Sequence, residues 1–403
     1  MADCYNEKKI LVLTPRFPFP VIGGDRLRIY KICQELSKHY ELTLLSLCET
    51  RKELTMEVDD KVFKNIYRVY LSRLQSKLNV ISAIPTRKPL QIAYYSSRKF
   101  KSKVNELMPN HDAVFSHLIR TGDYVKNINI KSILEMTDAI SLNYKRVAES
   151  NSEFSLRKLV YIFERKRLEK YERNIVNSFD MVSLISGIDK DYLYPQGHHK
   201  VKVYGNGVDT KNLIYKKRTV NNTEFISIIF IGNMYSLQNM DAVKWFCHEI
   251  LPNLCDATYK FKLKVVGKIK DSDRDYLNTI PNVEVTGTVN DINEACSDGH
   301  LAICPIRLGA GIQNKILEYM ALGLPCITSS VGFEGIGATD GREILIANNL
   351  EEYQRKIHEL INNKELFDKV SSNARTFVET HFSWEAKLNP LINDLNFLIG
   401  NSI

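Results

Sequence analysis

A buried strand that runs into a glycine-containing loop and then a helix, between residues 301 and 325, places the strongest limit on the fold. Residues 301–306 are continuously apolar, which is typical of a parallel strand covered on both faces. Apolar residues between 316 and 321 recur with helical spacing. Gly323 followed by Pro325 predicts the end of that helix. The segment therefore predicts one βα unit of an open α/β sheet.

The loop of this unit has the chemistry of an anion-binding site. Gly309 and Gly311 lack side chains that would keep an anion away from the backbone N–H groups, and the helix N-terminus that follows favours negative charge. Arg307 and Lys315 bracket the loop with positive charge. Glu318, one turn beyond Lys315, can accept hydrogen bonds from the hydroxyls of a ribose or sugar ring. The residues alone fit either a nucleoside-diphosphate-sugar site or a tight turn with surface charges.

Length and composition suggest two ordinary globular domains. The 403 residues exceed what one compact core usually holds, and 44% hydrophobic with 25% charged residues is typical of globular proteins. No apolar stretch approaches the ~20 residues of a membrane span, and the polar first residues show no signal peptide. The eight cysteines contain no Cys-x-x-Cys pair. They predict reduced, buried thiols in a cytoplasmic protein.

Positive charge gathers in two segments of a chain whose formal net charge is +8. Residues 87–103 combine six Lys and Arg with aromatic residues and no acid. This segment fits either contact with an anionic membrane or a solvated helix surface. Residues 157–173 alternate cations with glutamates, which is typical of a solvated helix face. We expect no nucleic-acid partner.

A second strand–glycine–helix junction occurs near the start of the chain. Residues 10–13 predict a buried strand, and Gly23 and Gly24 precede Asp25, which is suited to cap a helix over 26–36. The pattern Gly-x-Gly-x-x-Gly is absent here, which weakens a dehydrogenase interpretation.

Polar residues follow two further strands of the first half. Residues 111–117 and 131–136 predict strands that end at His117 and near Asp138. Parallel strands present their carboxyl ends at one edge of the sheet, so His117, Arg120 and Asp138 are predicted to lie beside a pocket there. A lone histidine in this position is more often simply a polar residue of the sheet edge.

A polar, Asn-rich linker over residues 210–223 separates two series of strands and helices. We expect an N-terminal domain at 1–209, a second domain at 210–385, and a C-terminal helix at 386–403 that crosses back to the first. The expected fold class is α/β, with two Rossmann-like doubly wound domains that face a central cleft.

Several short motifs, in their order along almost the full chain, resemble the GT-B glycosyltransferases of family 4, also called group 1. The bacterial exopolysaccharide-type subgroup fits best. The motifs are Pro-Val-Ile-Gly-Gly-Asp-Arg-Leu-Arg at 20–28, Asn-Gly-Val-Asp at 206–209, Phe-Ile-Gly-Asn-Met at 230–234, Val-Thr-Gly-Thr-Val at 285–289, the segment 307–320, and Phe-Ser-Trp-Glu at 382–385.

The resemblance implies an enzyme that moves a sugar from a nucleoside-diphosphate sugar, UDP- or GDP-linked, to a glycan or lipid-linked acceptor. It implies retention of the anomeric configuration, with neither a metal nor another cofactor. The reaction would belong to surface-polysaccharide or glycoconjugate assembly, in the cytoplasm or at the inner face of the membrane.

The resemblance also assigns roles to single residues. His117 would position a sugar hydroxyl, while Arg307 and Lys315 would neutralise the leaving diphosphate. Arg28, Arg120 and Asp138 are expected either to contact the acceptor or to be structural residues. The donor is expected to contact Gly23, Gly24, Gly232, Asn233, Thr288, Val289, Gly309, Gly311, Ile312 and Glu318.

Two positions depart from the family pattern. The first glutamate of the family's Glu-x7-Glu motif falls on Ala310, and the lysine that often follows the first strand of the second domain is replaced near Gln238 and Asn239. The sugar-ring contacts are therefore open, and Lys315 or backbone N–H groups would carry the phosphate contacts. A non-catalytic partner subunit and a nucleotide-sugar epimerase are the two alternatives with the same fold.

Overall fold

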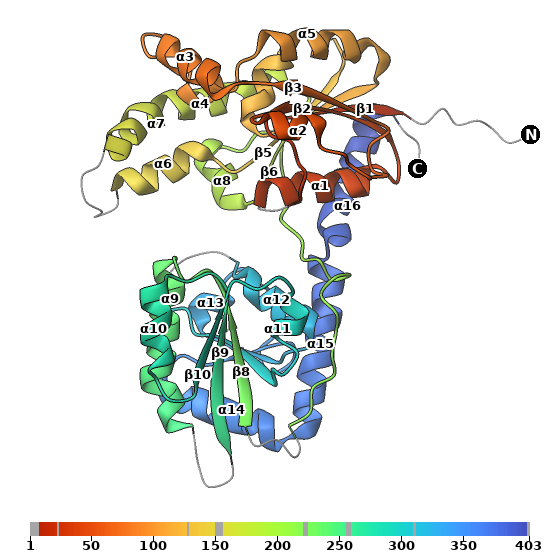
Figure 1. The fold of residues 1–403 in the computed structure, drawn as a ribbon. Helices are drawn as coiled ribbons and strands as arrows, with labels where there is room; N and C mark the ends of the chain where they lie inside the picture. Colours follow the sequence, from red (N-terminus) through yellow and green to blue (C-terminus); the bar gives the residue numbers. More distant parts are fainter. Residues whose placement is uncertain are drawn as a thin grey trace, which may run out of the picture. The chain divides into compact units, whose positions relative to one another are not determined.

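The computed structural model describes residues 8–21, 24–126, 129–149, 156–220, 225–254, 259–308 and 312–400. The chain divides into two compact units, of which the first comprises residues 1–206 and 387–403 and the second residues 207–386 (Figure 1). Each unit has its own parallel sheet with helices on both faces (Figure 1). The α/β class is therefore as predicted.

The sheet of the first unit has seven parallel strands in the order β3-β2-β1-β4-β5-β6-β7. Its central strand, β1, pairs with β2 on one side and β4 on the other, so the order reverses between β1 and β4. Ligands of doubly wound sheets bind at the carboxyl ends of strands at such a reversal. The strands are β1 (Lys9–Thr14), β2 (Glu41–Cys48), β3 (Asn65–Tyr70), β4 (Ala113–His117), β5 (Lys131–Thr137), β6 (Met181–Leu184) and β7 (Val201–Val203).

The helices of the first unit cover this sheet, and the last helix of the chain joins them (Figure 1). Two tyrosine hydroxyls donate hydrogen bonds to that helix, from Tyr40 to Asn396 and from Tyr204 to Asp394. The helices are α1 (Gly24–Leu36), α2 (Arg51–Thr55), α3 (Arg73–Ala83), α4 (Leu90–Tyr94), α5 (Arg98–Leu107), α6 (Ile140–Glu149), α7 (Leu156–Ile175), α8 (Gly187–Leu193) and α16 (Trp384–Ile399).

The helix predicted over 26–36 begins two residues earlier than expected. Asp25 lies in the first turn of α1 and does not cap it. Its carboxylate instead accepts from the Arg16 guanidinium at 3.4 Å and from the Arg26 N–H at 3.0 Å. The Asp25 carboxylate, which the sequence predicted as a helix cap, therefore contacts Arg16 instead.

The sheet of the second unit has six parallel strands in the order β10-β9-β8-β11-β12-β13, with the reversal between β8 and β11. The strands are β8 (Phe225–Ile231), β9 (Lys260–Val266), β10 (Val283–Gly287), β11 (Leu301–Cys304), β12 (Cys326–Thr328) and β13 (Leu345–Ile346). The helices are α9 (Leu237–Trp245), α10 (Asp271–Asn278), α11 (Ile292–Ala295), α12 (Asn314–Leu322), α13 (Ser330–Phe333), α14 (Leu350–Asn362) and α15 (Lys364–Phe382).

Two glycines, one at the end of α12 and one in the motif at 206–209, are required by local geometry. Gly323 ends α12 in the left-handed conformation, with φ of 74°, as the sequence predicted. A Cβ on Gly207 would lie 2.5 Å from the Cα of Trp384. The motifs at 206–209 and 382–385 therefore lie side by side, and the N–H of Val208 donates to the Phe382 carbonyl at 2.7 Å.

The six cysteines among the described residues are buried and unpaired, as predicted. Within the same residues, no helix has the length and apolar character needed to cross a membrane.

Candidate functional site

A pocket of about 550 Å³ opens in the second unit at the carboxyl edge of its sheet. Its wall combines the residues after β8, β9 and β10 with the N-terminal turn of α12. This is the reversal point of the strand order, where an open α/β sheet binds ligands. The structure brings seven of the residues singled out from the sequence into this wall: Gly232, Asn233, Thr288, Val289, Ile312, Lys315 and Glu318.

The floor of the pocket needs a glycine that sequence reasoning did not identify. Gly267 follows β9 with φ of 134°, and a Cβ there would lie 2.0 Å from the carbonyl oxygen of Gly232. The ends of β8 and β9 therefore approach more closely than any side chain at Gly267 would permit. A single glycine at the end of an apolar strand was the available signal.

Lys315 carries a buried positive charge into this pocket. Its ammonium donates to Oδ1 of Asn239 at 2.6 Å and to Oε1 of Gln313 at 3.4 Å. Both partners are neutral, and among the described residues no carboxylate forms an ion pair with the side chain, which is 8% exposed. Burial lowers the pKa of Lys315. An anion in the pocket would supply the missing countercharge.

Glu318 lies one turn further along α12 and also lines the pocket. Burial raises its pKa to about 7, and nearby Lys315 opposes this shift only in part. The Tyr319 hydroxyl accepts from the N–H of Ile231 at 2.7 Å, which fixes α12 against the end of β8. Helix packing thus holds a carboxyl group and a cation side by side without a direct ion pair.

Arg307 follows β11 but is not among the residues that line the pocket. Its guanidinium donates to both carboxylate oxygens of Asp241, at 3.1 and 2.7 Å, and lies 5.3 Å from the ring centre of Trp245. Its role at a diphosphate stays a prediction. The predicted contacts of Gly23, Gly309 and Gly311, and the departure at Ala310, lie outside the described residues.

The first unit contains a buried chain of charges at its own reversal point. His117 ends β4, and its Nδ1 lies 2.7 Å from Oε2 of Glu135 on β5. Oε1 of the same carboxylate accepts from Nε of Arg28 at 2.8 Å. Burial alone would raise the pKa of Glu135, but Arg28 and His117 outweigh it and lower that pKa to about 2. Glu135 is therefore an anion that holds both neighbours.

The same chain of contacts leaves one ring nitrogen of His117 unused. Its Nε2 is buried and has no hydrogen-bond partner among the described residues. Leu118 and Thr137, which follow at the two strand ends, have φ values of 62° and 67°. Non-glycine residues in this region store strain that often accompanies function. Sequence reasoning missed Glu135, although a glutamate inside an apolar strand was a usable signal.

Arg28 was expected on the acceptor side, but the structure places its side chain in the interior. Its guanidinium also donates to the Tyr204 carbonyl at 2.9 Å and to Oδ1 of Asn206 at 2.8 Å. Arg28 is 1% exposed, and its hydrogen bonds join α1 to Glu135 and to the segment after β7. The reason is its position on the face of α1 that packs on the sheet.

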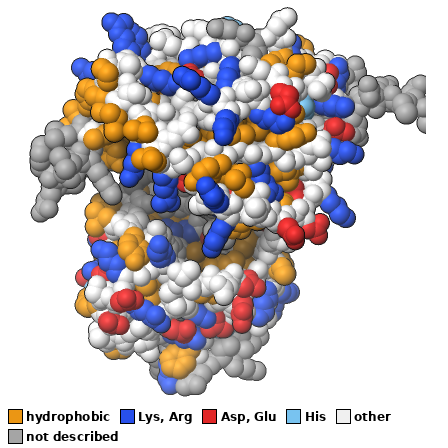
Figure 2. All heavy atoms as spheres, turned by 45° about the horizontal axis from the view of Figure 1, so that its top comes forward, with side chains coloured by type: hydrophobic (Ala, Val, Ile, Leu, Met, Phe, Trp, Pro, Cys, Tyr) orange, Lys and Arg blue, Asp and Glu red, His pale blue; other side chains and the backbone are white. Residues whose placement is uncertain are grey.

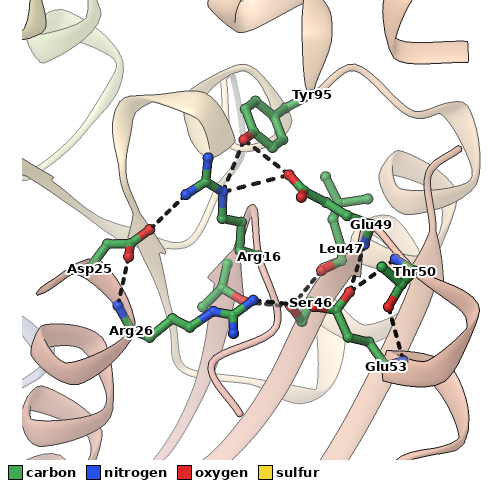
Figure 3. A network of polar contacts seen from close by, with 10 residues as sticks. Arg16, Asp25, Arg26, Ser46, Leu47, Glu49, Thr50, Glu53 and Tyr95 are labelled. Carbon is green, nitrogen blue, oxygen red and sulfur yellow. Dashed lines mark hydrogen bonds and ion pairs between the residues drawn. The ribbon is translucent and has the colours of Figure 1, made fainter. Parts of the chain in front are cut away.

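A second polar network lies around the Arg16 side chain, at the carboxyl ends of β1 and β2 (Figure 3). Nε of Arg16 donates to the Tyr95 hydroxyl at 3.1 Å, and that hydroxyl donates to Glu49 at 3.4 Å. These three residues come from segments far apart in the sequence, and none of them was selected from it. Charged side chains therefore gather at the carboxyl ends of β1 and β2.

The other two residues expected on the acceptor side lie in the same unit. Nε of Arg120 donates to Gln91 at 3.1 Å, and its guanidinium lies 5.1 Å from the ring centre of Tyr95. Burial lowers the pKa of Arg120. Asp138 is partly exposed just after β5. Acceptor binding by both residues stays a prediction.

Two Rossmann-like units in succession, each with a doubly wound parallel sheet, are the architecture of the GT-B class of protein. Comparison with known proteins agrees with this class. Residues 226–363 match the family model described as "Glycosyl transferases group 1". A 44.6 kDa protein in the cps region of Klebsiella pneumoniae is 24% identical over 396 residues, which cover 93% of this chain and 96% of that protein.

Solved structures extend the likeness over both units. Sucrose-phosphate synthase from Thermosynechococcus elongatus superposes with a TM-score of 0.64 at 14% identity, covering 98% of this chain and 100% of that one. Anabaena Alr3699/HepE, in complex with UDP-glucose, gives a TM-score of 0.58 at 15% identity, covering 96% and 99%. These similarities confirm the GT-B fold and the resemblance to group 1 glycosyltransferases.

Proposed function

We propose that this protein transfers a sugar from a nucleoside-diphosphate sugar, UDP- or GDP-linked, to a glycan or lipid-linked acceptor in surface-polysaccharide or glycoconjugate assembly. The group 1 family match, the relative in the cps region and the UDP-glucose bound to the Anabaena structure support the proposal. The observation that carries it is the buried ammonium of Lys315, which has only neutral hydrogen-bond partners among the described residues.

A diphosphate fits the pocket on electrostatic grounds. Its charge would stabilise the protonated form of Lys315, which burial alone disfavours. The first N–H groups of α12 point the positive end of the helix dipole the same way. Glu318, one turn away, would accept hydroxyls of the ribose. The pocket thus offers separate partners for the charged and the polyol parts of a nucleotide.

The proposed transfer retains the anomeric configuration. The bond from the sugar C1 to the diphosphate oxygen breaks, and a bond from the acceptor oxygen to C1 forms on the same face. The acceptor proton passes to the leaving phosphate oxygen, so the step needs no protein base. Lys315 and the N-terminus of α12 would stabilise the charge that develops on the diphosphate. In the first unit, Nε2 of His117 is a partner for a sugar hydroxyl.

A thermal-shift panel of UDP-, GDP-, ADP- and CMP-sugars with their free nucleotides tests the donor site. One nucleotide series should raise the melting temperature, because a ligand at about 100 times its Kd stabilises the fold by about 2.7 kcal/mol. Glu318→Ala should lose this shift. Glu284→Ala, which removes an exposed carboxylate of β10 in the same unit, should keep it.

A panel without any stabilising nucleotide would overturn the donor site and favour the non-catalytic partner subunit. With the donor known, turnover to a glycan or lipid acceptor should persist in EDTA. Loss of turnover in EDTA would contradict a metal-independent reaction.

A further inference from the structure

Helix α3 presents its apolar side chains to the outside. The residues it buries are Ser76 and Ala83, which are small. Leu74, Leu78 and Ile81 are instead 70%, 57% and 62% exposed. Their spacing of four and then three residues places them on one face of the helix. An ordinary surface helix turns such a face to the core, so α3 is inverted.

Polar contacts hold α3 in this orientation. Nδ2 of Asn79, on its inner side, donates to the Ser96 carbonyl at 2.8 Å. From α7, the Arg167 guanidinium donates to the carbonyls of Ala83 at 2.9 Å and Lys88 at 2.7 Å. Ser72 caps the first turn of the helix. The helix is therefore firmly attached while its apolar face stays uncovered by the described residues of its unit.

The apolar surface continues past the end of α3. Ile84, the residue after the helix, is exposed, and so is Phe163 of α7. The Arg167 guanidinium that holds the end of α3 lies 5.1 Å from the ring centre of Phe163. The α3 surface, defined as Leu74, Leu78, Ile81, Ile84 and Phe163, thus spans two helices.

The segment of the chain that contains α3 is strongly basic. The sequence from residue 61 to residue 105 contains eleven Lys and Arg and no Asp or Glu. Arg73 and Lys77 are exposed on α3 itself. Figure 2 shows basic and hydrophobic side chains interspersed over this face of the first unit.

A basic hollow of about 430 Å³ lies beside α3, since its wall includes Ser96, whose carbonyl accepts from Asn79 on the inner side of that helix. The one acid in its lining, Asp123, pairs with Lys88 at 2.9 Å and Lys126 at 2.7 Å. Three further cations of the lining form no ion pair with the described residues: Arg98, Lys101 and Arg120. The hollow has the charge to receive an anionic headgroup.

We propose that the α3 surface and the adjacent hollow dock the first unit on an anionic lipid bilayer. The apolar side chains would enter the boundary between headgroups and acyl chains, and the surrounding cations would meet lipid phosphates. A symmetric contact between two copies would place the same cations against each other without acids to offset them. The docking needs no sugar transfer, so it stands or falls independently of the proposed reaction.

Vesicle cosedimentation of the full chain tests the docking. The protein should bind vesicles of phosphatidylcholine with about 30% phosphatidylglycerol at least ~10-fold more tightly than phosphatidylcholine alone, and added salt should weaken this binding. Leu78→Gln with Ile81→Gln should reduce binding about 10-fold or more. Leu237→Gln, which changes a leucine that is 78% exposed in the second unit, is the matched control and should leave binding unchanged.

The double variant should keep the melting temperature, because both side chains are already exposed. Three results would overturn the proposal: no vesicle binding by the unchanged protein, equal binding by the double variant, or equal binding to both vesicle types. A protein that fails to bind vesicles but forms a dimer that the double variant dissociates would show instead that α3 joins two copies.

Discussion

Both units bury charged side chains near the strand-order reversal of their sheets, but the partners of those charges differ. In the first unit, Glu135 is paired with Arg28 and His117, and its pKa falls to about 2. In the second unit, Glu318 and Lys315 have no ion-pair partner among the described residues. Burial raises the pKa of Glu318 and lowers that of Lys315, so it favours the neutral form of each. Equal topology therefore does not determine equal electrostatics.

The difference indicates a division of work. A fully paired buried charge fixes its neighbours but has little left to offer a ligand, apart from the unused Nε2 of His117. A buried charge without a countercharge costs stability, and a ligand of opposite charge recovers that cost. We infer that the first unit uses its charges as a frame and the second keeps them for binding.

The largest expected effect comes from removing the charge of Glu135, which holds Arg28 and His117. Glu135→Gln should lower the free energy of unfolding of the first unit by about 3–5 kcal/mol, because it leaves the Arg28 guanidinium buried without its anion. Urea unfolding followed by circular dichroism measures this. Glu106→Gln removes an exposed carboxylate of the same unit that pairs with Lys103, and should change stability by less than about 0.5 kcal/mol. Equal effects of the two variants would contradict the frame.

Removing the uncompensated cation should act on activity instead of stability. Lys315→Met keeps the apolar stem, so the melting temperature should stay the same or rise, while turnover should fall by about 10²–10³-fold. Steady-state rates with the donor found by the nucleotide panel give the comparison. Lys264→Met changes a lysine of the same unit that pairs with Asp298 outside the pocket, and should leave turnover unchanged. An unchanged rate in Lys315→Met would contradict the proposal that Lys315 stabilises the leaving diphosphate.

The smallest effect is a pair of pH slopes of opposite sign. The folded protein keeps the Glu318 proton up to about pH 7, so this group should make stability fall as pH rises from about 4.5 to 7, by at most about 1.4 kcal/mol per pH unit. Glu135, with its pKa of about 2, contributes stability that is present above about pH 4.5 and is lost as pH falls toward 2.

Urea unfolding at several pH values should show the first slope in the unchanged protein and not in Glu318→Gln. An identical pH profile for the two proteins would mean that the Glu318 carboxyl group is not perturbed in the folded state.

Much of the fold could be predicted from residues close together in the sequence. Continuous apolar runs such as β1 and β11 predicted buried strands, and Gly323 predicted the end of α12. The motifs after β8 and β10 and in the first turns of α12 indicated seven residues that line one pocket. The predictions of strands and of the helix end succeed because backbone geometry and hydrophobic periodicity act over a few residues.

Long-range contacts set the limit of such prediction. Asn239 was noticed only as a departure from the family pattern, yet it accepts from Lys315 across 76 residues of sequence. Arg28 reaches Glu135 across 107 residues of sequence, so the burial of its side chain could not be predicted from its neighbours in the sequence. The apolar residues of α3 could be recognised as a helical stripe, but their exposure depends on which face the rest of the unit covers.

The sequence by itself thus determined the strands, the order of βα units and the chemical groups at their ends, because these depend on local periodicity and on turn residues. The tertiary structure decided which charges are paired and which have no ion-pair partner among the described residues. The physical reason is that ionisation and hydrogen bonding of a buried group depend on burial and on neighbours within a few ångströms, and folding draws those neighbours from distant parts of the chain.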